Sequence, residues 1–264
     1  MTETHDAAFA GKIAIVTGGG TGLGRVVTRG LVARGARAVV VASRDPAHHA
    51  EVVAEGNGRI ESLVLDVREP DRIREAFDAI AAKHGGIDVL INNAAGNFIV
   101  PSLRLKPKAW RAVIDIALSG TFFCSQAAGR VMAESGRGGS IVNIGATYAW
   151  TGMPGVVHSA AAKAGVLAIT RTLAVEWAPH AIRVNCVAPG PFDSHGAEKN
   201  LWPTPAARAA IERTIPTGRF ASVDEVAAAV LWLASPAAPS VTGDCLVIDG
   251  GQSLGRSMFD VIPS

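Results

Sequence analysis

The sequence contains a single tyrosine, Tyr148, and only three cysteines, Cys124, Cys186 and Cys245. The cysteines are far apart and form no CxxC pair, so the sequence predicts neither a disulfide framework nor a metal site. We interpret them as small buried hydrophobic residues of a protein in a reducing compartment.

Other missing features exclude whole classes of function. The formal net charge of +2 is too small to indicate a nucleic-acid partner. The N-terminus lacks the pattern of a signal peptide, no apolar run approaches a membrane span, and the chain ends without a peroxisomal Ser-Lys-Leu. We therefore expect a soluble, cytoplasmic protein that binds no membrane.

Apolar residues make up 48% of the 264 residues, enough for the core of one large domain spanning residues 1–264. Short β-branched runs alternate with amphipathic stretches, which predicts an α/β single-domain Rossmann fold, a doubly wound parallel sheet of about seven strands flanked by helices. The expected strands are Ile13–Thr17, Ala38–Ala42, Ser62–Leu65, Val89–Asn92, Ser140–Ile144, Arg183–Ala188 and Cys245–Ile248. The expected helices are Leu23–Arg34, Pro70–Lys83, Pro107–Glu134, His158–Ala178 and Ser222–Ala234.

The segment Pro191–Gly218 is the least regular part of the chain. It is too long for an ordinary connection between strong elements, so it is either a substrate lid or a plain surface insertion. Phe192 and Trp202 in this segment are candidates for an acyl slot, although ordinary packing explains them better.

A glycine-rich turn follows the first expected strand and opens the first helix. Glycines there let backbone N–H groups approach a pyrophosphate at the positive end of the helix. The candidate cofactor contacts in this turn are Gly18, Thr21, Gly22, Leu23 and Gly24.

The end of the second strand selects the nicotinamide cofactor. Enzymes that use NAD generally place an acid there for the ribose 2′-hydroxyl, whereas this chain has Ser43 and Arg44, which suit a 2′-phosphate. Asp45 follows at once, so a shift of one residue would restore the acid, and Arg25 is a further candidate cation. The balance predicts NADPH (NADP) as the cofactor.

Together with Asn92-Asn93-Ala94-Ala95-Gly96 and a lysine, Lys163, on an alanine-rich helix, these motifs resemble the short-chain dehydrogenase/reductase family over nearly the whole chain. The resemblance implies homotetramers, a ribose contact from Lys163, and further cofactor contacts from Asp66, Val67, Asn93, Ala94, Pro189 and Gly190. The chain departs from the family at two positions, because Ser159 replaces the usual catalytic tyrosine and Ala146 the assisting serine.

Three longer segments of the sequence suggest which residues replace the usual catalytic tyrosine and serine. The segments Asn92–Phe98 and Thr147–Gly152 are similar to those of 2,4-dienoyl-CoA reductases, as is the stretch Val156–Gly165. In the mitochondrial branch of that group the active site consists of the residues that match Tyr148, Asn97, Ser159 and Lys163. The peroxisomal branch uses an aspartate instead, and the matching position here is Ala117.

The resemblance implies NADPH-dependent reduction of a 2,4-dienoyl-CoA to an enoyl-CoA through a dienolate, in unsaturated fatty acid oxidation. Tyr148 and Asn97 would donate hydrogen bonds to the thioester oxygen. Three alternatives stay open: a trans-2-enoyl-CoA reductase, a 3-oxoacyl or carbonyl reductase, and a non-catalytic NADP-binding protein. Cations for the Coenzyme A phosphates are not assigned among Lys199, Arg208, Arg213 and Arg219.

Overall fold

The computed structural model describes residues 7–193 and 204–255. Its centre is a parallel seven-stranded sheet with the order β3-β2-β1-β4-β5-β6-β7. The strands are β1 Ile13–Thr17, β2 Ala38–Ser43, β3 Ile60–Val64, β4 Val89–Asn92, β5 Gly139–Ile144, β6 Ile182–Pro189 and β7 Cys245–Ile248. The predicted doubly wound parallel sheet is confirmed.

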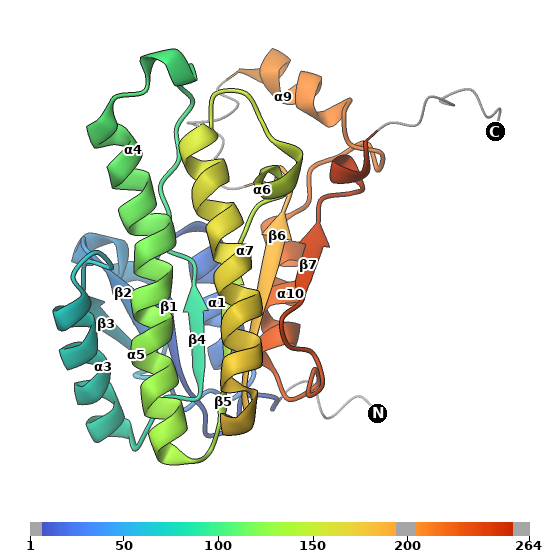
Figure 1. The fold of residues 1–264 in the computed structure, drawn as a ribbon. Coiled ribbons are helices and arrows are strands. Elements are labelled where there is room, and N and C mark those ends of the chain that lie inside the picture. The colour runs from blue at the N-terminus through green and yellow to red at the C-terminus, as the bar shows by residue number, and fades with distance from the viewer. Residues whose placement is uncertain (1–6, 194–203, 256–264) are drawn as a thin grey trace.

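Helices cover both faces of the sheet, and α3, α5 and α7 lie on the face toward the viewer in Figure 1. The helices are α1 Gly22–Ala33, α2 Ala50–Glu55, α3 Pro70–His84, α4 Pro107–Ile114, α5 Gly120–Ser135, α6 Tyr148–Thr151, α7 Val157–Trp177, α9 Pro205–Glu212 and α10 Val223–Ala234. Single turns form η1 Pro46–His48, η2 Ser102–Arg104, η3 Asp115–Ser119, η4 Ala178–His180 and η5 Gln252–Leu254. Two hydrophobic cores result, one under α1 and α10 and one under α3, α5 and α7.

The strand order changes direction at β1, which has β2 on one side and β4 on the other. In an open α/β sheet, ligands bind at the carboxyl ends of the strands beside such a switch point. The short helix α6 and the helix α9 lie at this end of the sheet, where the strand arrows point in Figure 1.

Several sequence expectations need correction. The helix expected over Pro107–Glu134 is interrupted by η3, a π turn, and β3 begins two residues earlier than expected. The helices α2, α6 and α9 were not expected, because short helices contain too few residues to show a hydrophobic period.

The helical run Pro107–Ser135 is long and apolar enough by length and composition to cross a membrane, contrary to the expectation from sequence. Half of its most apolar window is buried inside the protein, where α5 packs on α3 and α7. This burial is what a core helix of a globular domain shows.

The cysteine interpretation is wrong at one position. Cys124 and Cys186 are buried free thiols, but Cys245 on the edge strand β7 is partly exposed. Within residues 7–193 and 204–255, no three histidine, cysteine or acidic side chains lie close enough to hold a metal ion.

Candidate active site

A cavity of about 660 Å³ opens at the carboxyl ends of β4, β5 and β6. Its walls come from the segment after β4, from α6 and α7, and from η5 near the C-terminus. Of the residues expected at the site, those that line it are Leu23, Asn93, Asn97, Tyr148, Lys163, Pro189 and Gly190. The topology therefore gathers residues that are far apart in the chain.

The glycine turn has the geometry of a phosphate cradle. Gly18 and Gly22 have φ of +64° and +49°, which side-chain-bearing residues rarely adopt. A Cβ on Gly24 would lie 2.1 Å from the carbonyl oxygen of Gly18. Thr21 precedes α1 without a side-chain cap, and the first turn of α1 contains no acid. Backbone N–H groups at this helix end are thus left for an anion.

Hydrogen bonds join the glycine turn after β1 to the residues that follow β4. The side chain of Asn93 donates to the carbonyl oxygens of Thr17 and Gly18, both at 3.1 Å. The backbone N–H groups of Asn93 and Ala94 both donate to Thr17 Oγ1 at 3.0 Å. Asn93 therefore holds the loop in place with its amide, and this internal role was not expected from the sequence.

The end of β2 presents a hydroxyl, a guanidinium group and a carboxylate in sequence. Ser43 is the last residue of β2, and Arg44 is exposed just beyond it. The carboxylate of Asp45 accepts the N–H of Ala47 at 2.9 Å and so caps η1. This bond uses one oxygen of an exposed carboxylate, so Asp45 can still accept a hydrogen bond from a ribose hydroxyl.

Arg25, the further candidate cation, is paired with Glu51 and Glu55 of α2. Its charge is compensated inside the protein, so the structure gives no support to a phosphate contact from Arg25. Asp66 is also paired, through bidentate hydrogen bonds from Arg68 that lower the pKa of its carboxyl. Val67, the neighbour of Asp66, is buried against Gly120 of α5.

Three side chains of the expected catalytic set meet on one side of the cavity. Tyr148 Oη and Ser159 Oγ share a hydrogen bond of 2.9 Å. Asn97 Nδ2 donates to Tyr148 Oη at 3.4 Å, while Asn97 Oδ1 accepts the N–H of Phe98 at 2.9 Å. The bond from Phe98 fixes the orientation of the amide, so that its N–H₂ end faces the tyrosine.

The tyrosine is protonated at neutral pH. Burial raises the pKa of the Tyr148 hydroxyl above its usual value, and the hydrogen bond with Ser159 only partly offsets this effect. The cluster thus presents neutral O–H and N–H donors, which suit an oxyanion that forms during a reaction.

Lys163 lies on the next turn of α7 after Ser159 and is 7% exposed. Its Nζ donates to the carbonyl oxygen of Ile144 at 2.5 Å. Burial lowers the pKa of Lys163 to about 8. The ammonium group has two further N–H donors beside the cavity, which can meet the hydroxyls of a ribose.

The residues present therefore fit a nicotinamide dinucleotide. The uncapped end of α1 and the glycines provide the phosphate cradle, and Lys163 provides buried donors for a sugar. Sequence reasoning missed Gln252 and Thr214, which are hydrogen-bonded to each other at 2.7 Å and close the cavity from the C-terminal side. Neither residue belongs to a motif, so no pattern in the chain signals them.

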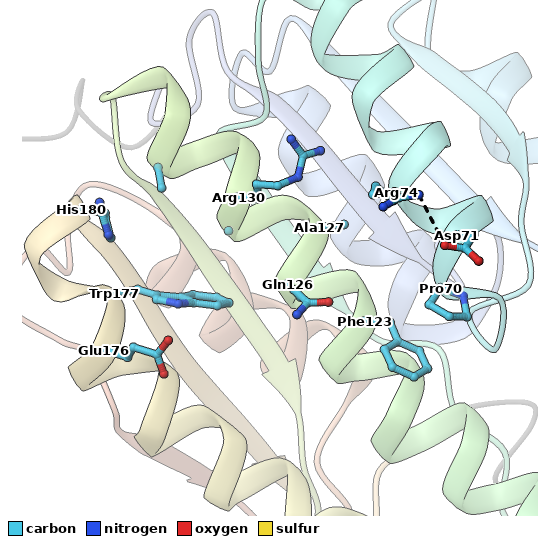
Figure 2. Close-up of a pocket in the computed structure, with 12 residues that line it drawn as sticks. Pro70, Asp71, Arg74, Phe123, Gln126, Ala127, Arg130, Glu176, Trp177 and His180 are labelled. Atoms are coloured by element: carbon cyan, nitrogen blue, oxygen red, sulfur yellow. Dashed lines mark hydrogen bonds and ion pairs between the residues drawn. The ribbon is translucent and has the colours of Figure 1, made fainter.

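A second cavity, of about 580 Å³, lies away from this site on the outer surface of α3, α5 and α7. Figure 2 shows Phe123 and Gln126 of α5 and Trp177 of α7 along it, with Arg74 and Asp71 paired on α3. None of the expected catalytic or cofactor residues lines it.

Comparison with known proteins matches residues 18–253 to the family model described as enoyl-(acyl carrier protein) reductase. The chain is 43% identical over 255 residues to a probable 2,4-dienoyl-CoA reductase [(2E)-enoyl-CoA-producing] of Bacillus subtilis strain 168, covering 94% of this chain and 99% of that protein. It is 40% identical over 251 residues to the peroxisomal 2,4-dienoyl-CoA reductase [(3E)-enoyl-CoA-producing] of Danio rerio, covering 92% and 82%.

Among solved structures, the chain is similar to a gluconate 5-dehydrogenase from Burkholderia cenocepacia J2315 in complex with NADP and tartrate. The TM-score is 0.90 at 31% identity, covering 96% of this chain and 100% of that one.

Proposed function

Because the chain belongs to the short-chain dehydrogenase/reductase family of oxidoreductases, we propose that it reduces 2,4-dienoyl-CoA thioesters with NADPH. The observation that carries the proposal is the cluster of Asn97, Tyr148 and Ser159 beside the buried Lys163. The curated relatives named 2,4-dienoyl-CoA reductases support the substrate class.

The residues have distinct roles in this proposal. A bound reduced nicotinamide supplies the hydride, and Lys163 holds the ribose through its free N–H donors. Tyr148 O–H and Asn97 N–H donate to the thioester oxygen, where negative charge collects as the diene accepts the hydride and becomes a dienolate. Each donor of this kind is worth roughly 3 kcal/mol of transition-state stabilisation. A proton that enters from solvent then adds to a carbon of the dienolate and gives the enoyl-CoA. Ser159 keeps the Tyr148 hydroxyl oriented.

The preference for NADPH rests on the end of β2. Ser43 and Arg44 present a hydroxyl and a guanidinium group there, beside Asp45, one oxygen of which caps η1. A guanidinium group suits a phosphate better than a neutral hydroxyl. Equilibrium binding of NADPH and NADH to the purified protein measures this preference directly.

The reaction is tested by following NADPH oxidation with 2,4-hexadienoyl-CoA and trans-2-hexenoyl-CoA in parallel. Rapid turnover of the diene alone is the expected result. Turnover of the monoene alone would identify a trans-2-enoyl-CoA reductase, the second candidate, which the description of the matching family model favours. Product analysis of the diene reaction then distinguishes a 2-enoyl from a 3-enoyl thioester.

If NADPH binds but neither thioester causes NADPH oxidation, the proposed reaction is contradicted. This result would favour the two remaining alternatives, a 3-oxoacyl or carbonyl reductase and a non-catalytic NADP-binding protein. The pair of substrates therefore separates the two thioester reductases from these alternatives, and a 3-oxoacyl substrate then distinguishes a carbonyl reductase from a non-catalytic protein.

We also propose that the segment 191–218 acts as the substrate lid. Phe192, Ile211 and Thr214 from its described parts line the cavity. Lys199 and Trp202, two residues considered for the Coenzyme A end and the acyl slot, lie outside the described residues. Arg208 is paired with Asp193 and Glu212, and Arg219 with Glu225, so both serve ion pairs within the chain.

For the assembled protein we propose a cytoplasmic homotetramer that uses the outer face of α5 and α7. Along α7 small and apolar exposed residues recur at helical spacing, with the charged Arg171 and Glu176 beside them near the C-terminal end of the helix. The row consists of Val157, Ala161, Ala164, Ala168, Thr172 and Val175. Val175 is 79% and Val157 43% exposed, and together with the alanines between them they form a continuous surface that a partner can cover.

A further inference from the structure

His49 forms a buried link between two strands at the cofactor end of the sheet. It lies at the start of α2 and is only 1% exposed. Its Nε2 is 2.6 Å from Ser43 Oγ at the end of β2, and its Nδ1 is 2.5 Å from Ser62 Oγ on β3. Both ring nitrogens are therefore fixed by hydroxyl groups.

The glycine turn packs directly on this histidine. A Cβ added to Gly20 would lie 2.0 Å from the carbonyl oxygen of His48 and 3.2 Å from Cδ2 of His49. The imidazole thus sits between the expected pyrophosphate cradle and Ser43, which faces the expected 2′ position of the ribose. No role in the proposed reaction accounts for it.

The protonation state of His49 decides what Ser43 can do. A neutral imidazole has one N–H group, so its Nε2 can be the acceptor of a hydrogen bond from the Ser43 hydroxyl. A protonated imidazole donates from both nitrogens, so Ser43 Oγ and Ser62 Oγ must both accept. The Ser43 hydroxyl then no longer donates to the imidazole and is free to donate elsewhere. Among the described residues, the acceptor within reach is the carbonyl oxygen of Asp45, at 3.2 Å.

We propose that His49 is a positioning residue for the 2′-phosphate of NADPH, which takes up a proton when the dianion binds and turns the Ser43 hydroxyl toward it as a donor. The inference rests on the proposed use of NADPH. Ser62, the other end of the link, is exposed on the edge strand β3, so the proton can exchange with water.

The surroundings of His49 agree with this role. Burial lowers the pKa of His49 below its usual value and His48 lowers it further, while Asp45 raises it. The free protein therefore holds a neutral His49 near pH 7. A phosphate dianion nearby favours the charged imidazolium and raises the pKa again.

Few other charges act on the imidazole. β2, β3 and the glycine turn present the uncharged Ser43, Ser62 and Gly20 to it. The nearby charged groups are Asp45 and His48 of η1, Glu51 of α2, which is paired with Arg25, and the exposed Arg44. The 2′-phosphate is thus the one group whose arrival distinguishes NADPH from NADH at this position.

The test is calorimetric binding of NADPH and of NADH near pH 7, in two buffers of different ionisation enthalpy, which counts protons exchanged on binding. The wild-type protein is expected to take up more protons with NADPH than with NADH. The phosphate itself has a second pKa of about 6 and can only release protons as it binds beside a cation, so net uptake must come from the protein. Absence of this extra uptake would overturn the proposal without any variant.

The variant His49→Gln keeps a polar side chain but cannot take a proton. It is expected to lose the extra uptake and to bind NADPH about tenfold more weakly, the scale of one charge-assisted hydrogen bond. Its affinity for NADH should stay unchanged, which also shows that the site is folded. The matched control is His48→Gln, the exposed neighbour, which should retain the extra uptake.

The outcomes separate this inference from the proposed function. Equal affinity of the wild-type protein for NADPH and NADH would refute the NADPH preference itself. A wild-type preference for NADPH that His49→Gln retains, together with the proton uptake, would refute only the role of His49. Loss of the uptake in His48→Gln alone would place the titrating group on the surface instead.

Discussion

At the residue scale, the chemistry of the site depends on which groups stay neutral. Tyr148 is kept protonated by burial, and Asn97 has its amide orientation fixed by the backbone N–H of Phe98. Ser159 holds the tyrosine from the position that the family usually gives to the tyrosine itself. The donor thus reaches the cavity from α6 rather than from α7.

Tyr148→Phe removes one donor to the thioester oxygen. We expect kcat for the diene to fall by about 10²- to 10³-fold, while the Kd for NADPH is unchanged, because the lost bond forms mainly in the transition state. Steady-state kinetics and fluorescence titration measure the two quantities. Trp150→Phe, an exposed aromatic on the same helix, is the matched control and should keep its kcat. Near-normal turnover of Tyr148→Phe would remove the tyrosine from the mechanism.

Burial of the Lys163 ammonium group lowers the stability of the folded protein. The pKa of this group in the folded protein is about 8, against 10.5 for an ordinary lysine, so the folded protein binds fewer protons between these pH values. The destabilisation is therefore fully present below pH 8, and stability is recovered as the pH rises from about 8 to 10.5.

Lys163→Met should therefore stabilise the cofactor-free protein by about 3 kcal/mol at pH 7, from 1.36 kcal/mol per unit of pKa. The gain should shrink as the pH rises toward 10.5, and NADPH binding should weaken because the ribose loses its donors. Urea unfolding of both proteins across this pH range measures the difference. A gain that does not change with pH would show that packing, not charge burial, is responsible.

At the scale of the elements, the strand ends and the turns that follow them make the site. The turn after β1 is clasped to the end of β4 through Thr17 and Asn93, so the phosphate cradle and the substrate cavity form one rigid unit. In the turn after β2, Asp45 caps η1 and the Ser43 hydroxyl is hydrogen-bonded to His49 and to the carbonyl oxygen of Asp45. Each of these loops uses its polar groups to fix backbone shape.

Gly24→Ala tests the cradle. The new Cβ would lie 2.1 Å from the carbonyl oxygen of Gly18, so the turn must shift and its N–H groups no longer converge on a phosphate. We expect the affinity for NADPH to fall by about tenfold or more. Gly136→Asn is the matched control for binding, because Gly136 lies at the far end of α5, a Cβ there meets no atom within 4 Å, and asparagine tolerates its positive φ. Equal affinities of the two variants would argue against a close backbone contact.

At the scale of the whole molecule, the two faces of the sheet differ in what covers them. The core under α1 and α10 is closed by these helices within the chain. On the other face, α7 leaves its row of small and apolar residues open beside the cavity lined by Phe123 and Trp177, as Figure 2 shows for the neighbouring surface of α5 and α7. A second copy of the chain is the proposed cover.

Ala168→Arg places a charge in the middle of this row. Because Ala168 is exposed in the single chain, the fold should survive while the assembly dissociates to smaller species. Light scattering coupled to size-exclusion chromatography measures the mass. Ala82→Arg, at an exposed alanine of α3 outside the row, should leave the mass unchanged. A wild-type monomer, or a tetramer that tolerates Ala168→Arg, would contradict the proposed interface.

The sequence by itself determined the sheet and the cofactor turn. Strands buried on both faces are almost wholly apolar, so β1 and β4 could be located to the residue. β7 was also located to the residue, although it is a partly exposed edge strand. The glycines at Gly18 and Gly22 are required by positive φ, and that requirement is local to the turn. These features follow from neighbouring residues alone.

The family resemblance pointed to Asn97, Tyr148 and Ser159 as one site, but only the tertiary structure decided how these side chains contact one another. The distances from Asn97 to Tyr148 and from Tyr148 to Ser159 depend on how the loop after β4 and the helices α6 and α7 pack, across separations of 51 and 11 residues. In the same way, the contact of His49 with β2 and β3 arises from packing. The Asp45 cap of η1 is different, because Asp45 accepts the N–H of Ala47 only two residues later, which is a local bond. Hydrogen bonds between distant segments form only after the core has brought those segments together, so no local pattern in the chain records them.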